Sequence, residues 1–131
     1  MINSVTTIDD IIIEFRGLLD AGAVEITLIA QDLCAYGKDL SEKASLAKLL
    51  RALDQVADSY ERPVWIRCMY AYPRGLTQEV MDIMGRSKHI VPYLDMPLQH
   101  ISDSMLRRMR RGKGGESTLA LLRRLRAAIP N

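Results

Sequence analysis

The sequence predicts an α/β fold, part of a (β/α) barrel in which about three parallel strands carry outer helices. Two observations predict this class: short apolar runs alternate with amphipathic stretches, and the order is helix–strand–helix–strand–helix–strand–helix–helix. Strands joined through a helix are expected to be parallel, because the helix is the crossover connection that a parallel pair needs. We expect both faces of the sheet to be covered, since parallel sheets are normally buried on both sides. Residues 1–131 should form one partial barrel domain.

The first helix is expected between Ile8 and Leu19, where apolar residues recur at three- and four-residue spacing. Thr7 suits the N-cap, Asp10 is placed as its capping-box partner, and Gly22 suits the C-terminal end. Further helices are expected over residues 46–56, 77–84, 102–109 and 117–128. Methionines are expected to fill gaps in the core: Met69, Met81, Met84, Met96, Met105 and Met109.

Three apolar runs are the expected strands: residues 24–30, 64–70 and 90–96. Pro92 weakens the third run, since proline cannot donate a hydrogen bond to the sheet. In parallel α/β folds, ligands bind at the C-terminal ends of the strands. The segments that follow these runs are therefore where a site is expected.

Polar side chains do follow the expected strands. Gln31 and Asp32 come after the first run, and Gln99, Ser102 and Asp103 come after the third. These five residues are the candidate cofactor-binding side chains at the sheet edge. Asp32 and Asp103 suit a turn or helix cap as well, and the residue types leave both interpretations open.

Two further residues near this edge have alternative interpretations. Asp95 lies within an apolar run, so it should either face a pocket or pair with an arginine. His100, directly before an expected helix, is more typical of a structural hydrogen-bonding residue than of a base. The sequence contains no P-loop, no GxGxxG and no metal motif, so no catalytic residue and no metal ligand is assigned.

The composition is that of a soluble globular protein, with 48% hydrophobic and 26% charged residues. No apolar run is long enough to span a membrane, and residues 1–10 carry no basic side chain, so a signal peptide is not expected. A cytoplasmic location without a membrane partner follows as the expectation. Cys34 and Cys68 belong to no ligand motif, and free, half-buried thiols are expected.

Positive charge is concentrated at the C-terminal end. Eight of the 18 basic residues, but only one of the 16 acidic ones, follow Asp103. We call these residues the basic tail: Arg107, Arg108, Arg110, Arg111, Lys113, Arg123, Arg124 and Arg126. Such a cluster suits contact with nucleic acid or an acidic partner, and it equally suits a solvated helix face.

Three long motifs at the strand ends are specific to one enzyme family. Residues 28–37, LIAQDLCAYG, 65–73, WIRCMYAYP, and 93–103, YLDMPLQHISD, resemble the corresponding stretches of RimO-type methylthiotransferases in the right order. Leu106 and the Met109-Arg110-Arg111 run extend the third motif. The Ala-Gln-Asp and Pro-Leu-Gln-His segments resemble this family rather than its tRNA-modifying relatives.

The resemblance implies a radical SAM (β/α) barrel that uses S-adenosylmethionine and [4Fe–4S] clusters. It implies addition of a methylthio group to the β-carbon of an aspartate in the small-subunit ribosomal protein S-twelve, which would be the partner. With such a partner, the basic tail would be placed to contact ribosomal RNA. Gln31, Asp32, Gln99, Ser102 and Asp103 stand where such proteins hydrogen-bond the amino, carboxylate or ribose groups of the cofactor.

The sequence also departs from the family pattern. The family's CxxxCxxC cluster loop would precede Ser4, and its next strand would follow Asn131, but neither is present in the sequence. The expectation is an internal piece of such an enzyme, inactive alone, with its cluster ligands elsewhere. The alternatives are a non-catalytic basic fragment that binds RNA or the ribosome, or a piece of a tRNA-modifying methylthiotransferase.

Overall fold

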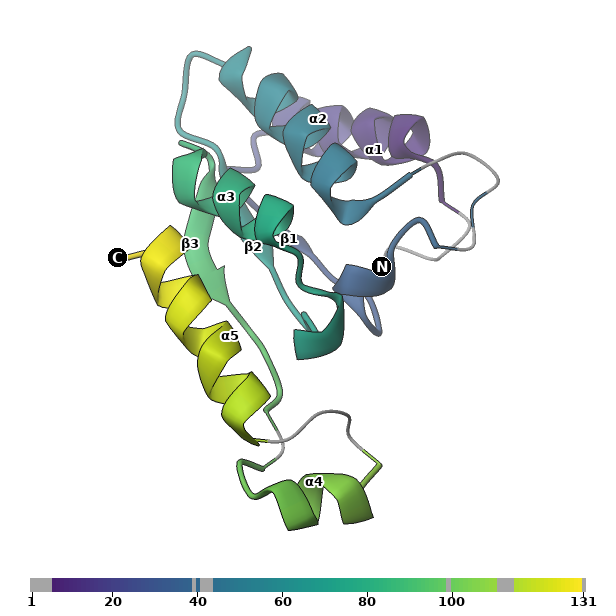
Figure 1. Ribbon diagram of the computed structural model, residues 1–131. Helices are drawn as coiled ribbons and strands as arrows, with labels where there is room; N and C mark the ends of the chain where they lie inside the picture. The colour runs from purple at the N-terminus through teal and green to yellow at the C-terminus, as the bar shows by residue number, and fades with distance from the viewer. Residues whose placement is uncertain (1–5, 39, 41–43, 99, 111–114, 131) are drawn as a thin grey trace.

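A computed structural model describes residues 6–38, 40, 44–98, 100–110 and 115–130. The described elements follow the predicted order, with two short 3-10 helices in addition (Figure 1). The α-helices are α1 (Ile8–Asp20), α2 (Leu46–Asp58), α3 (Gln78–Arg86), α4 (Asp103–Arg108) and α5 (Gly115–Ala128). The strands are β1 (Glu25–Leu28), β2 (Trp65–Cys68) and β3 (Ile90–Leu94), and the 3-10 helices are η1 (Leu33–Ala35) and η2 (Pro73–Gly75).

The three strands form one parallel sheet in the order β1-β2-β3, which confirms the predicted class. β1 and β2 pair without interruption, from Glu25 opposite Trp65 to Leu28 opposite Cys68. The pairing of β2 with β3 is irregular, because Ile66 lies opposite Ile90 whereas Cys68 lies opposite Leu94. β3 therefore carries two extra residues at Pro92, where the ladder lacks an N–H donor.

Helices cover one face of this sheet and leave the other open. α1, α2, α3 and α5 pack side by side in that sequence (Figure 1). Alternate strand residues pointing into the helix layer are buried, namely Ile26, Leu28, Ile66, Cys68 and Ile90. The residues between them are exposed or half-buried, among them Glu25, Thr27, Trp65, Arg67 and Tyr93. The expectation of a sheet covered on both faces is wrong for the described residues, because every described helix that packs on the sheet lies on the same side.

Local sequence signals for the helices are confirmed. The Thr7 hydroxyl accepts a hydrogen bond from the Asp10 N–H at 3.2 Å, and the Asp10 carboxylate accepts from the Thr7 N–H, which completes the capping box. The Thr77 hydroxyl caps α3 by accepting a hydrogen bond from the Val80 N–H. Gly22 follows α1 with a φ of +97°, a conformation that costs glycine little.

The core lies between the helix layer and the sheet. Phe15, Leu50, Leu53 and Met81 are among its almost fully buried side chains. The prediction that all six internal methionines fill the core is wrong at α4, because Met105 is 37% exposed and Met109 is 42% exposed. The helix α4 lies beyond the end of β3, apart from the sheet (Figure 1), and Leu106 is its buried residue.

Candidate functional site

The C-terminal ends of the three strands are held together through one residue of the second strand's motif. The Tyr70 N–H donates to the Asp95 carboxylate at 3.2 Å, and the Tyr70 carbonyl accepts from the Leu33 N–H at 3.1 Å. The Ala71 N–H adds a bond to the Asp95 carbonyl at 2.9 Å. Tyr70 has a φ of +57°, which is rare for a side chain of this size and typical of functional sites.

These bonds resolve the interpretation of Asp95. Its carboxylate accepts a backbone N–H from the neighbouring strand end, and among the described residues it forms no ion pair with an arginine. The arginine of β2, Arg67, pairs with Glu25. Asp95 therefore fixes the edge of the sheet where the candidate site is expected.

Asp32 is half-buried at the start of η1, directly after the first strand end. One carboxylate oxygen accepts a hydrogen bond from the Cys34 N–H at 3.0 Å, so the capping interpretation of Asp32 is confirmed. Among the described residues the second oxygen has no hydrogen-bond partner and remains able to bind a cationic group. Gln31, beside it, is exposed.

The candidates after the third strand lie near α4. The Ser102 N–H donates to His100 Nδ1 at 2.8 Å, so His100 acts as a structural acceptor. The Ser102 hydroxyl lies 3.0 Å from the Ser104 hydroxyl and does not cap α4. Asp103 is exposed in the first turn of α4, and Gln99 lies outside the described residues. In Figure 1 the helix α4 lies well apart from the blue segment that forms η1, so the described structure does not bring these two elements together.

The two cysteines are buried rather than half-buried. Burial raises the pKa of Cys34 to about 12 and that of Cys68 to about 12. Thiols with such pKa values stay protonated at neutral pH, and the thiolate is the form that ligates metals. A [4Fe–4S] cluster needs several thiolates, so these two residues do not fit one. Among the described residues, no group of three or more His, Cys, Asp or Glu side chains could hold a metal ion.

Sequence reasoning missed a polar group on the open sheet face. The Arg67 Nε donates to the Glu25 carboxylate at 2.6 Å, and the guanidinium lies 5.0 Å from the centre of the Tyr93 ring. The hydrogen bond from Arg67 lowers the pKa of Glu25, and the same bond raises the pKa of Arg67. The signal in the sequence is one charged residue in each of two apolar runs, Glu25 and Arg67. Both lie on the side of the strand that alternates with the buried residues, which indicates an uncovered face.

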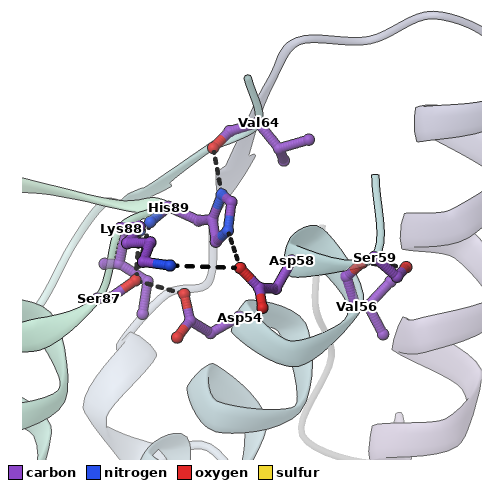
Figure 2. A network of polar contacts seen from close by, with 9 residues as sticks. Asp54, Val56, Asp58, Ser59, Val64, Ser87, Lys88 and His89 are labelled. Atoms are coloured by element: carbon purple, nitrogen blue, oxygen red, sulfur yellow. Dashed lines mark hydrogen bonds and ion pairs between the residues drawn. The ribbon is translucent and has the colours of Figure 1, made fainter. Parts of the chain in front are cut away.

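A second polar cluster lies at the opposite, N-terminal end of the strands (Figure 2). His89 Nδ1 lies 3.2 Å from the Val64 carbonyl, and its Nε2 lies 3.4 Å from the Asp58 carboxylate. The Ser87 hydroxyl donates to Asp54 and accepts the His89 N–H. This cluster ties the start of β3 to α2 and β2, a stabilising role that suits the N-terminal end of the strands.

The described part of the basic tail is exposed. Arg107, Arg108 and Arg110 of α4 and its end, and Arg123, Arg124 and Arg126 of α5, all lie at the surface. Arg111 and Lys113 lie outside the described residues. A solvated face and a contact with RNA both require this exposure, so the two interpretations stay open.

A parallel sheet with helices on one face and polar residues at its strand ends defines a partial β/α fold, a class in which ligands commonly bind at that edge. No family model matches the chain. Curated relatives named ribosomal protein uS12 methylthiotransferase RimO do match it. The protein of Flavobacterium psychrophilum is 47% identical over 124 residues, which cover 95% of this chain and 28% of the relative.

Two more of these relatives give the same result. The protein of Flavobacterium johnsoniae is 48% identical over 94% of this chain and 27% of its own length. That of Myxococcus xanthus is 46% identical over 94% of this chain and 25% of its own length. The chain thus belongs to the RimO-type methylthiotransferase family and spans about a quarter of the length of the relatives it matches. No helix in the described part of the chain is long and apolar enough to cross a membrane.

Proposed function

We propose that this sequence forms part of the barrel of a cytoplasmic enzyme that adds a methylthio group to ribosomal protein uS12. The carrying observation is the similarity to uS12 methylthiotransferases over 94–95% of the chain in the three relatives named above. The motifs at the strand ends support it, since those segments are where ligands of (β/α) enzymes bind.

S-adenosylmethionine, when bound beside a [4Fe–4S] cluster, would supply the methyl and radical chemistry that the family resemblance implies. The cysteine ligands of that cluster would come from outside this sequence. Two residues of this chain, Gln31 and Asp32, are proposed to bind the methionine part of S-adenosylmethionine. The free oxygen of Asp32 can accept a hydrogen bond from the cofactor's ammonium group, because its other oxygen already holds the Cys34 N–H. Gln31 is exposed beside it and can bind a polar group of the same ligand.

Ser102, Asp103 and Gln99 belong to the same proposal, as residues that bind ribose or carboxylate groups of the cofactor. Because α4 lies beyond the end of β3, Ser102 and Asp103 would have to meet the same ligand as Asp32 across the open side of the sheet. The described helices cover one face of the sheet and bury its side chains. The open face would then line the interior of the barrel, with the target aspartate of uS12 entering from the strand ends.

Deleting the gene for this chain in its own organism tests the proposed function. We expect uS12 from the deletion strain to lack the mass of one methylthio group, and the modification to return when the gene is restored. Mass spectrometry of uS12 peptides measures both. If uS12 carries the same modification with and without the gene, the proposed function is wrong.

The same strains test the alternative of a tRNA-modifying enzyme. Methylthio-modified nucleosides in tRNA hydrolysates should be unchanged by the deletion. Loss of such a nucleoside with uS12 unaffected would assign the chain to the tRNA-modifying branch.

A further inference from the structure

We propose that Arg67 is a carboxylate-binding residue on the open face of the sheet, held in place by Glu25 and Tyr93. This inference rests on the proposed function for the identity of its ligands, which are the methionyl carboxylate of S-adenosylmethionine or the side chain of the substrate aspartate. Both sources present the same group to the guanidinium, and they can be distinguished by experiment.

The first observation is the incomplete use of the Arg67 guanidinium. It carries five N–H donors in a planar fork, and a carboxylate can take two of them side by side. Within the described residues only the Nε–H has a partner, the Glu25 carboxylate at 2.6 Å. The edge formed by the two terminal nitrogens therefore remains available on a side chain that is 28% exposed.

The second observation is that the orientation of Arg67 is fixed from two sides. Glu25, on the neighbouring strand, holds Nε, and the Tyr93 ring lies against the guanidinium at 5.0 Å on the other side. Tyr93 comes from the irregular part of β3 next to Pro92, where the ladder between Ile66 and Cys68 is interrupted. Such bulges commonly redirect a side chain beside a functional site. A preorganised fork loses less entropy when it binds a planar anion.

The third observation is the location. Arg67 is one residue before the end of β2, whose next residues lead to Tyr70 and the Asp95 contact at the strand ends. It lies on the face that no described helix covers. A cation at this position is near the edge where a ligand of a (β/α) enzyme binds. The Glu79–Arg51 pair, at the same 2.6 Å, lies instead on exposed surfaces of α3 and α2.

Trp65 provides an internal reporter for this face. It is the single tryptophan of the chain, is 53% exposed and precedes Arg67 by two residues, so both side chains point to the same side of the sheet. Its fluorescence in the full purified chain can be titrated with S-adenosylmethionine and with decarboxylated S-adenosylmethionine. A second pair of ligands is the uS12 loop peptide with its target aspartate and the same peptide with asparagine.

We expect one of the two carboxylate ligands to bind about tenfold to a hundredfold more tightly than its carboxylate-free partner, as charge-assisted hydrogen bonds commonly give. The pair that discriminates identifies the source of the carboxylate. Arg67→Gln should remove the discrimination, Arg67→Lys should keep part of it, and Tyr93→Phe should keep more of it than Tyr93→Leu. Arg51→Gln is the matched control and should change nothing, and thermal melting checks that each variant is folded.

The inference is overturned if neither carboxylate ligand gives a saturable change, if the discrimination survives in Arg67→Gln, or if Arg51→Gln removes it equally. These results are independent of the gene deletion. Loss of uS12 modification together with no discrimination would retain the proposed function and reject the role of Arg67. Unchanged uS12 modification together with clear discrimination would reject the proposed function and retain the role of Arg67.

Discussion

Replacing Asp32 with asparagine should lower the affinity for S-adenosylmethionine about tenfold to a hundredfold, while the melting temperature stays unchanged. Asparagine keeps the oxygen that accepts the Cys34 N–H, so η1 should start as before. It loses the negative charge that would hold the cofactor's ammonium group, and hydrogen bonds to charged groups are worth about 1.5–3 kcal/mol. Calorimetric titration of the purified protein measures the affinity.

Two companion variants separate charge from capping at Asp32. Asp32→Ala removes both functions, so it should lose affinity and also about 1 kcal/mol of stability. Asp82→Asn, in a carboxylate that accepts a hydrogen bond from Gln78 on α3, is the control and should keep the affinity. If Asp32→Asn binds the cofactor as tightly as the unmodified protein, Asp32 is only a cap and its proposed role fails.

Replacing Gly37 with alanine should lower the free energy of unfolding by about 2–5 kcal/mol. Gly37 has a φ of +83°, and a left-handed conformation costs other residues about 1–2 kcal/mol. An added Cβ would also lie 2.5 Å from the Ala44 carbonyl carbon, so the backbone before α2 must shift, at a cost of about 1–3 kcal/mol. Urea denaturation followed by circular dichroism measures the loss.

Gly17→Ala is the matched control for Gly37. Gly17 lies inside α1, and beyond the backbone of its own helix and its chain neighbours nothing would lie within 4 Å of an added Cβ. Alanine in a helix interior is favoured by about 0.5–1 kcal/mol over glycine, so this variant should be slightly more stable. Equal stability of the two alanine variants would contradict the close approach at Gly37.

Most of the fold could be predicted from local signals. Thr7 with Asp10 and Thr77 gave the helix starts, and the three apolar runs gave the strands in the right order, because caps and periodicity act over a few residues. The sidedness of the sheet was predicted wrongly, because the apolar residues of the runs outnumber Glu25 and Arg67, the charged residues that indicate an open face. Apolar strands suggested two covered faces, whereas coverage depends on where the helices pack in three dimensions.

The candidate site could likewise be predicted only in part from the sequence. The capping role of Asp32 follows from its sequence position two residues before the N–H it binds, and the structure confirms it. The bond from Tyr70 to Asp95 joins residues 25 positions apart, and only the pairing of β2 with β3 brings them together. The group of Glu25, Arg67 and Tyr93 likewise needs the register of three strands, which no local pattern reveals.

The central claim is that this sequence supplies a barrel segment of a uS12 methylthiotransferase, and a segment exchange tests it most directly. The matching 124-residue stretch of the Flavobacterium psychrophilum relative would be replaced by the sequence of this chain. The exchanged protein would then be produced in a strain without its own uS12 methylthiotransferase, and uS12 would be weighed by mass spectrometry. We predict that uS12 gains the mass of one methylthio group. Unmodified uS12, with the exchanged protein soluble and the original relative active in the same strain, would contradict the claim.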